Sequence, residues 1–194
     1  MAATLDRHEQ IILFLNRRGY AKFVSCRQCG YVIKCEHCDV PYNFHKYKHQ
    51  LLCHYCGKSI PMVDSCPSCG SKHIREFGVG TQKVQSMISD LFPEAKVLRM
   101  DYDTTTGKHG HQEVLDSFEA HEADILLGTQ MVAKGHHFDN VTLVGVLAAD
   151  MSLYTNDFRA SERTFQLLPQ VIGRSGRGSK QGQAVIQTYS PDHY

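Results

Sequence analysis

Short apolar runs alternate along most of the chain with segments whose apolar residues recur at helical spacing. Residues 11–15 form a continuous apolar run, as expected for a strand that is buried on both faces of a parallel sheet. The apolar residues of 84–91 recur at i, i+3, i+4 and i+7, which predicts an amphipathic helix that ends near Pro93. Further strands are expected at 73–79, 96–100, 123–127, 141–149 and 183–189, and further helices around 114–118 and 161–168.

This alternation predicts an α/β fold with a parallel sheet, right-handed crossovers and helices on both faces. In such sheets the chemistry gathers where the strands end. The expected strand ends are Asn16, Asp101, Thr129 and Asp150.

A cysteine-rich segment interrupts the alternation. All eight cysteines form C-x-x-C pairs, namely Cys26/Cys29, Cys35/Cys38, Cys53/Cys56 and Cys66/Cys69. No secretion signal opens the chain, and no apolar run reaches the length of a membrane span, so disulfides and a membrane location are not expected. Eight thiolates supply two tetrahedral zinc sites, with disulfides or an iron–sulfur cluster as the alternatives.

The pairing of the cysteines depends on the geometry of the chain. Adjacent pairing would close one site across residues 30–34, which is tight, whereas an interleaved cross-brace stays possible. We favour nested pairing because it brings residues 25 and 70 together, as an insert in a folded domain requires. The expected zinc sites are Cys26, Cys29, Cys66 and Cys69, and Cys35, Cys38, Cys53 and Cys56. The expected domains are a discontinuous sheet domain, 1–24 with 74–194, and a zinc-binding insert, 25–73.

The charge of the chain is polarised. The chain has 21 basic and 20 acidic residues, but residues 17–58 contain eight basic and only two acidic ones. Such a segment is usually a solvated face, although it is also where a polyanion would bind. Residues 42–49 interleave aromatic with basic side chains, which suits stacking on nucleic-acid bases. The alternative is that Tyr42 and Phe44 form the small core of the zinc module.

Two loops carry residues suited to phosphate chemistry. Residues 128–138 follow a strand and contain glycines and Lys134, so their backbone amides could approach a phosphate. Gln170, Arg174 and Arg177 would share one helix face, and converging arginines stabilise charge in phosphoryl transfer. The chain contains no P-loop, because Gly57-Lys58-Ser59 lacks the required earlier glycine. The chain by itself is therefore expected not to hydrolyse ATP.

Several segments together resemble the second RecA-like lobe of superfamily 2 helicases, and specifically the bacterial primosomal replication-restart helicases. The resemblance covers nearly the whole chain and includes the eight-cysteine insert. It is carried by residues 14–21, the insert that follows, and residues 99–105, 126–138, 157–163 and 170–177.

The resemblance implies that the chain is part of an ATP-dependent 3′–5′ DNA helicase that acts at stalled or forked replication intermediates. Arg177 would be the arginine finger, with Arg174 and Gln170 on the nucleotide phosphates. The motif V loop would comprise Gly128, Thr129, Gln130, Lys134 and Gly135. ATP and Mg²⁺ would bind only together with a first lobe that carries the P-loop.

The resemblance also implies partners and a location. The partners would be forked and single-stranded DNA, other primosome proteins and the single-stranded-DNA-binding protein, in the bacterial cytoplasm. The family pairs its cysteines in the nested manner. Pro169 departs from the pattern, so the helix that leads to Arg177 is expected either to restart at Pro169 or to be kinked there.

The alternative function is a non-catalytic zinc-binding adaptor that contacts nucleic acid or protein through residues 41–58. This interpretation explains the cysteines and the basic segment. It leaves the loops at 128–138 and 170–178 without a role.

Overall fold

The chain folds into two compact units. The computed structural model describes residues 1–15, 23–78, 80–101, 104, 110–129, 132, 138–155, 157–176, 180–189 and 191. The first unit, here called the sheet unit, comprises residues 1–17, 79–149 and 162–187. The second, here called the cysteine unit, comprises residues 18–78, 150–161 and 188–194.

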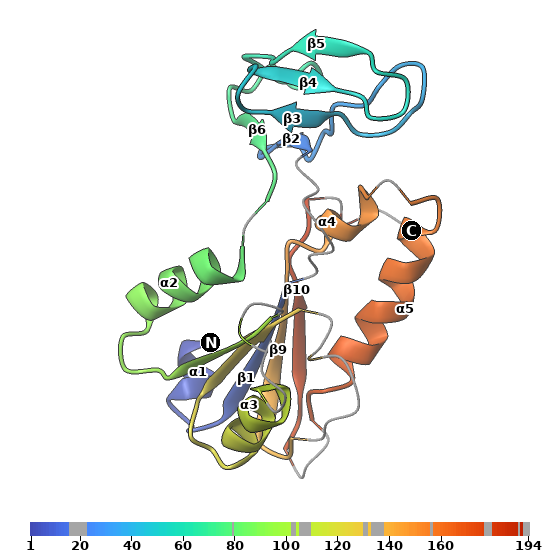
Figure 1. Ribbon diagram of the computed structural model, residues 1–194. Helices are drawn as coiled ribbons and strands as arrows, with labels where there is room; N and C mark the ends of the chain where they lie inside the picture. The colour runs from blue at the N-terminus through green and yellow to red at the C-terminus, as the bar shows by residue number, and fades with distance from the viewer. Residues whose placement is uncertain are drawn as a thin grey trace. The chain divides into compact units, whose positions relative to one another are not determined.

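The sheet unit is built on five parallel strands in the order β10–β9–β1–β8–β7 (Figure 1). The strands are β1 (Gln10–Leu15), β7 (Val97–Met100), β8 (Ile125–Gly128), β9 (Val141–Leu147) and β10 (Gln183–Ile186). All six residues of β1 are buried because this strand has a neighbour on each edge and helices over both faces. The predicted α/β parallel sheet is therefore confirmed, with the apolar run at 11–15 as its central strand.

Helices cover both faces of this sheet. They are α1 (Ala2–Leu5), α2 (Thr81–Leu91), α3 (Gly110–Glu119) and α5 (Ala160–Ile172). Ile12 and Phe14 of β1 share one core cluster with Phe118 of α3 and Val171 of α5. On the other face α1 contacts β1, and α2 contacts β7 and β8. Figure 1 accordingly shows α1 and α2 on one side of the strands and α5 on the other.

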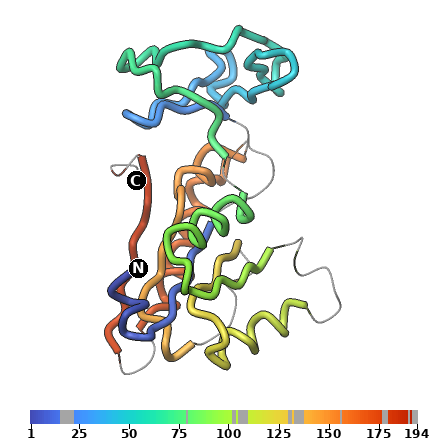
Figure 2. The backbone as a smooth tube through the Cα atoms, turned by 90° about the vertical axis from the view of Figure 1, so that its left-hand side faces the viewer, coloured from blue at the N-terminus to red at the C-terminus, as the bar shows by residue number. Residues whose placement is uncertain are grey.

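The cysteine unit contains two small antiparallel sheets. One pairs β2 (Val24–Cys26) with β6 (Ile74–Glu76), and the other joins β3 (Asn43–His45), β4 (Gln50–Leu52) and β5 (Ser59–Pro61). The short helix α4 (Asp150–Leu153) belongs to the same unit. In Figure 2 the strands β2 to β6 lie in the blue to green part of the tube, residues 24–76 on the colour bar. The unit has its own core, in which Tyr42 and Leu51 pack with buried cysteines.

Three strand expectations need correction. The strand within 73–79 is β6, which pairs antiparallel with β2 and is not part of the parallel sheet, because Cys26 lies opposite Ile74 and closes the insert. The strand expected at 141–149 ends at Leu147, since Ala148 takes a positive φ of 49° and turns the chain. Asp150 therefore begins α4 rather than ending a strand. The last strand ends at Ile186, before the expected end at 189.

The helix that contains Pro169 neither ends nor restarts there. Helix α5 runs through Pro169 to Ile172, and the Gly173 amide donates to the Pro169 carbonyl at 2.9 Å. Pro169 is exposed and lies near the end of α5, and it has no amide to donate to the Phe165 carbonyl four residues earlier. Among the described residues, no helix is long and apolar enough to cross a membrane.

Candidate functional site

The eight cysteines form two four-sulfur clusters. In each cluster the Sγ atoms lie within 4.8 Å of one another, and the clusters are Cys26, Cys29, Cys66 and Cys69, and Cys35, Cys38, Cys53 and Cys56. This is the nested grouping. The Sγ atoms of Cys26 and Cys69 are 3.6 Å apart, much longer than a disulfide bond. A zinc tetrahedron with Zn–S bonds of about 2.3 Å has edges of about 3.8 Å, so the sulfur positions fit zinc.

The backbone of each cysteine knuckle turns through a residue with positive φ. In three knuckles this residue is glycine: Gly30, Gly57 and Gly70 have φ values of 74°, 76° and 72°. In the fourth knuckle it is Asp39, with φ 51° and its amide 2.8 Å from the Cys35 carbonyl. The glycines were visible in the sequence, whereas Asp39 was missed because the left-handed conformation is uncommon for aspartate.

The crowding of four sulfurs drives the thiol pKa values of the second cluster apart. Burial raises the pKa of Cys35, but amide hydrogen bonds from His37 and Cys38 outweigh it and lower the pKa to about 6. In the same cluster, burial together with the sulfurs of Cys56 and Cys53 raises the pKa of Cys38 to about 12. Four thiolates therefore cannot coexist without a compensating positive charge, which Zn²⁺ supplies. The chain holds two structural zinc ions, each bound by four cysteine thiolates.

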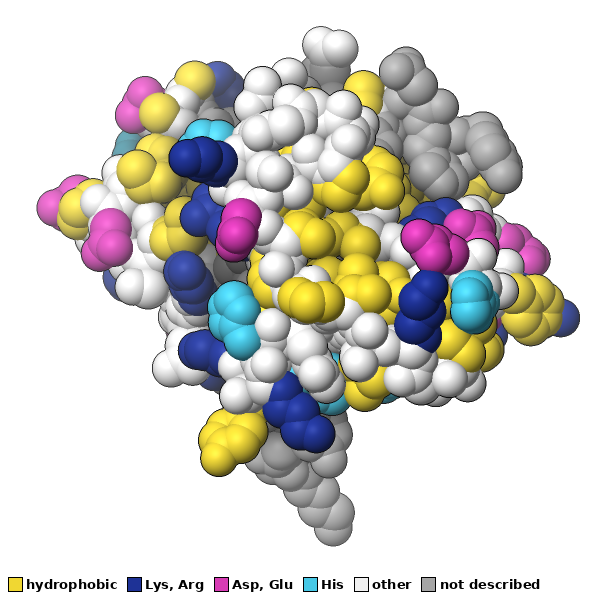
Figure 3. Space-filling view, turned by 90° about the horizontal axis from the view of Figure 1, so that it is seen from above, with side chains coloured by type: hydrophobic (Ala, Val, Ile, Leu, Met, Phe, Trp, Pro, Cys, Tyr) yellow, Lys and Arg dark blue, Asp and Glu magenta, His cyan; other side chains and the backbone are white. Residues whose placement is uncertain are grey.

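The zinc centres change the charge of the basic segment. A zinc ion with four thiolates has a net charge of −2, and two such centres offset much of the excess of lysine and arginine. Lys58 is also paired with Glu36 at 2.8 Å, and Lys34 with Asp39 at 3.3 Å. In the view of Figure 3, lysine and arginine side chains lie scattered around a central apolar area rather than in one patch.

The aromatic residues of 42–49 divide between the core and the surface. Tyr42 is 2% exposed and Phe44 packs against the same core, as the small-core interpretation expected. Tyr47 is fully exposed in the turn between β3 and β4, next to Lys46 and Lys48. Neither of these two lysines has an ion-pair partner within the part of the chain that the structure describes. Stacking on bases therefore stays a prediction that concerns Tyr47 alone.

At the carboxyl edge of the sheet, Asp101 holds helix α2 in place. The Thr81 hydroxyl, at the start of α2, donates to Asp101 Oδ2 at 2.5 Å, and the Thr104 amide donates to Oδ1 at 3.1 Å. Burial raises the pKa of Asp101, but these hydrogen bonds and the nearby Arg99 outweigh it and keep the pKa below its usual value. Asp101 is thus a structural anchor. Sequence reasoning missed its partner Thr81, although Gly80-Thr81 is typical of a helix start.

The loop after β8 begins with a glycine that the packing requires. A Cβ atom at Gly128 would collide with the Val132 side chain and lie 3.0 Å from the Met100 carbonyl oxygen. The next amide, that of Thr129, donates to the same carbonyl at 3.3 Å, and the Val132 amide donates to Thr129 O at 3.1 Å. This tight turn begins the predicted motif V loop. Its further predicted residues, Gln130, Lys134 and Gly135, lie outside the described residues.

Of the three residues predicted to act on the nucleotide phosphates, Gln170 and Arg174 are described. Gln170 is exposed, Arg174 is half-buried, and the Arg174 Nε donates to the Gln170 carbonyl at 3.3 Å across the end of α5. Arg174 lies two residues beyond the end of α5 at Ile172, so the expectation that Gln170, Arg174 and Arg177 share one helix face stays a prediction. Arg177 and Asn16 lie outside the described residues.

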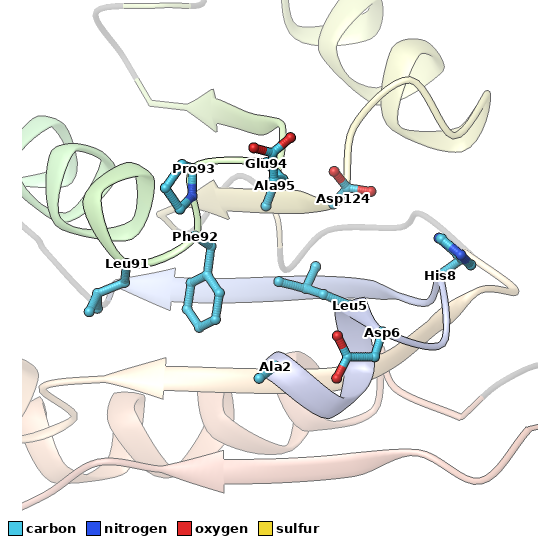
Figure 4. Close-up of a pocket in the computed structure, with 10 residues that line it drawn as sticks. All are labelled: Ala2, Leu5, Asp6, His8, Leu91, Phe92, Pro93, Glu94, Ala95 and Asp124. Atoms are coloured by element: carbon cyan, nitrogen blue, oxygen red, sulfur yellow. The ribbon is translucent and has the colours of Figure 1, made fainter.

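A cavity of about 600 Å³ opens at the opposite edge of the sheet, beside the starts of β7 and β8 (Figure 4). Its walls include the apolar Leu5 and Phe92 and the carboxylates of Asp6, Glu94 and Asp124. The Asp124 carboxylate accepts the Lys96 amide at 2.8 Å. Three carboxylates disfavour phosphate, so this cavity does not suit a nucleotide.

The comparisons with known proteins agree with this geometry. Residues 35–61 match the model of the PriA DNA helicase Cys-rich region (CRR) domain. Replication restart protein PriA of Bacillus subtilis is 55% identical over 98% of this chain, and the protein of that name in Synechocystis is 48% identical over 96%. The chain spans only about a quarter of these relatives, 24% and 23% of their lengths. Residues 73–179, more than half of this chain, match the model of the helicase conserved C-terminal domain. The chain therefore belongs to that family.

Proposed function

We propose that this chain is the second RecA-like lobe of an ATP-dependent 3′–5′ DNA helicase that acts at stalled or forked replication intermediates during replication restart. The observation that carries this proposal is the 55% identity to a replication restart protein PriA over 98% of the chain. The helicase match over residues 73–179 and the two cysteine clusters support the proposal, because the chain combines a helicase lobe with a cysteine-rich insert.

In this proposal the end of α5 faces the nucleotide. Arg177 acts as the arginine finger, and Arg174 and Gln170 bind the phosphates and couple the two lobes. The exposure of Gln170 and the hydrogen bond from Arg174, just beyond the end of α5, to the Gln170 carbonyl support this role. The P-loop comes from another lobe, and Mg²⁺ neutralises charge on the phosphates when it is bound.

The loop after β8 connects the nucleotide to the DNA strand. Thr129, Gln130, Lys134 and Gly135 line this loop, and lobe closure shifts it along the strand. The turn at Gly128 supports the proposal, since it fixes the start of the loop at the carboxyl end of a buried strand. The partners are forked and single-stranded DNA, other primosome proteins and the single-stranded-DNA-binding protein, in the bacterial cytoplasm.

The substitution Arg177→Ala in the full-length protein tests the proposal. We expect DNA-stimulated ATP hydrolysis to fall by about 10³-fold, because an arginine finger stabilises charge that develops only in the transition state. DNA binding, measured by fluorescence anisotropy, is expected to persist.

Arg75→Ala is the matched control, because Arg75 is an exposed arginine on β6 in the cysteine unit. It should leave ATP turnover unchanged. An Arg177→Ala protein with near-normal turnover would show that Arg177 is not the arginine finger.

A further inference from the structure

Asp150 is a buried carboxylate that holds the segment following β10. Its side chain belongs to a residue only 2% exposed. Oδ1 accepts a hydrogen bond from the Thr188 hydroxyl at 2.8 Å, and Oδ2 accepts one from the Tyr189 amide at 3.0 Å. Each carboxylate oxygen of Asp150 therefore accepts a hydrogen bond, and the two donors belong to consecutive residues. Hydrogen bonds to a charged acceptor are the stronger kind, so this attachment is a firm one.

The same segment packs against the outer cysteine knuckle, residues 26–30. The Arg27 guanidinium lies 4.1 Å from the centre of the Phe77 ring and 5.7 Å from that of Tyr189. The rings of Phe77 and Tyr189 meet edge to face, with their centres 6.0 Å apart. Tyr189 thus contacts Arg27, from inside the knuckle, and Phe77, which directly follows β6.

The backbone of the knuckle also touches the segment directly. A Cβ atom at Gly30 would lie 2.8 Å from the Tyr189 carbonyl oxygen and 3.1 Å from the Tyr189 Cβ. Gly30 follows Cys29, which binds the outer zinc ion. The outer site is the one formed by Cys26, Cys29, Cys66 and Cys69, and the inner site is the one formed by Cys35, Cys38, Cys53 and Cys56. The shape of the knuckle at this contact therefore depends on the outer zinc ion. Gly70 occupies the equivalent place in the second knuckle of the same site, and nothing lies within 4 Å of its Cβ position.

We propose that the outer zinc ion and the segment Thr188–Tyr189 stabilise each other, with Asp150 as the positioning residue. Zinc holds the knuckle in the shape against which Tyr189 packs, and the docked segment in turn favours the zinc-bound knuckle. Such a coupling is reciprocal by thermodynamic necessity. Through this coupling the outer zinc site holds Thr188 and Tyr189 in place. The coupling does not depend on helicase activity.

Two glycine substitutions separate this contact from simple backbone strain. Gly30→Ala and Gly70→Ala carry the same cost of positive φ, since their φ values are 74° and 72°. Only Gly30→Ala pushes against Tyr189. We expect Gly30→Ala to release one of the two zinc ions to a colorimetric chelator about 10-fold faster than Gly70→Ala does, a typical size for a lost supporting contact around a metal. Equal release rates would overturn the proposal.

Substitutions of Tyr189 test the same coupling from the other side. Tyr189→Ala should also speed the release of one zinc ion, whereas Tyr189→Phe, which keeps the ring contacts and loses only the hydroxyl partner of Arg27, should restore most of the normal rate. Adding Gly30→Ala to Tyr189→Ala should speed release further only as much as Gly70→Ala does by itself, because both changes undock the same segment and only the cost of positive φ remains. If the two substitutions multiplied each other's full effects on the release rate, the proposed coupling would be contradicted.

The reciprocal measurement follows the segment rather than the metal. Cys69→Ser removes an exposed ligand of the outer site, and Cys56→Ser removes an exposed ligand of the inner site. The Tyr189 amide, which is held by Asp150, should exchange its hydrogen at least about 10-fold faster in Cys69→Ser and not in Cys56→Ser. The same exchange rate in both variants would show that the outer zinc ion does not hold the segment.

Discussion

Single residues with several partners fix the geometry of both units. Asp150 and Asp101 each accept two or more hydrogen bonds and join elements that are far apart in the sequence. Neither residue is explained by its place in the apolar pattern, because that pattern places a residue at a strand end without naming its partner. Glu9 is a third case: it accepts hydrogen bonds from Arg7 Nε at 2.9 Å and from the Thr142 hydroxyl at 2.7 Å.

Glu9 should make the stability of the sheet unit dependent on pH. The hydrogen bonds from Arg7 and Thr142, with Lys180 nearby, lower the pKa of Glu9 from 4.5 to about 2. A carboxyl whose pKa is lowered on folding contributes stability above its unfolded pKa and loses it as the pH falls. We therefore expect Glu9→Gln to be less stable than the native chain at neutral pH, with the difference shrinking between pH 4.5 and about 2.

Urea unfolding at a series of pH values measures this difference. Glu119→Gln is the control, since Glu119 is exposed at the end of α3 and should change stability little at any pH. A Glu9→Gln difference that is constant with pH would show that the carboxylate charge of Glu9 is not the stabilising group.

At the scale of elements, the strands and helices follow from local pattern, but their limits follow from contacts. Helix α2 spans Thr81–Leu91, close to the helix predicted from its apolar spacing. In contrast, β9 ends two residues before its predicted end because Ala148 turns the chain. Strand β10 ends three residues before its predicted end, where Thr188 donates a hydrogen bond to Asp150. Helix α5 continues through Pro169 because its apolar face is buried, with Leu168 and Val171 in or against the core.

Replacing that proline should stabilise α5. Pro169 has no amide hydrogen for the carbonyl of Phe165, four residues earlier, and Pro169→Ala restores a donor in an exposed position. Part of the gain is offset because alanine leaves the unfolded chain more flexible than proline does. We expect a net gain of about 1 kcal/mol in the free energy of unfolding, as a rise in the urea midpoint.

Gln170→Ala is the matched control for this prediction. It lies next to Pro169 on the exposed side of the same turn and changes no backbone donor, so its effect should be within about 0.5 kcal/mol. A Pro169→Ala chain no more stable than Gln170→Ala would mean that the last turn of α5 tolerates proline without cost.

At the scale of the whole molecule, each unit has a hydrophobic core cluster of its own among the described residues. One contains only residues of the sheet unit, such as Phe14, Leu126 and Val144. The other contains only residues of the cysteine unit, among them four of the eight zinc-binding cysteines in fully buried positions. A small core of this kind needs metal to persist, whereas the sheet core does not involve any cysteine.

Removing zinc should therefore unfold one unit and spare the other. With a chelator, hydrogen exchange in residues 24–26, 50–52 and 74–76 should approach that of an unfolded chain, because zinc binding supplies the folding free energy of this unit. Exchange in β1 and β8 should stay slow. Loss of protection throughout the described chain in a single step would show instead that the two cores fold as one.

Much of this protein was predictable from its sequence. The apolar run at 11–15 predicted a strand buried on both faces, and the four C-x-x-C pairs supplied the donors for two zinc ions whatever their pairing. Both conclusions rest on local periodicity and on the chemistry of side chains, which do not depend on distant parts of the chain. The helicase family also followed from the sequence, because its motifs are local.

Only the tertiary structure decided which distant residues meet. It placed Asp39 in a left-handed turn and joined Asp150 to Thr188 and Tyr189, whereas the nested cysteine clusters confirmed the pairing that the sequence had favoured. Such contacts depend on where the whole chain closes, and many pairings of the same local elements satisfy the same sequence pattern. The physical reason is that hydrogen-bond partners and close backbone approaches are set by packing in three dimensions, about which spacing along the chain carries little information.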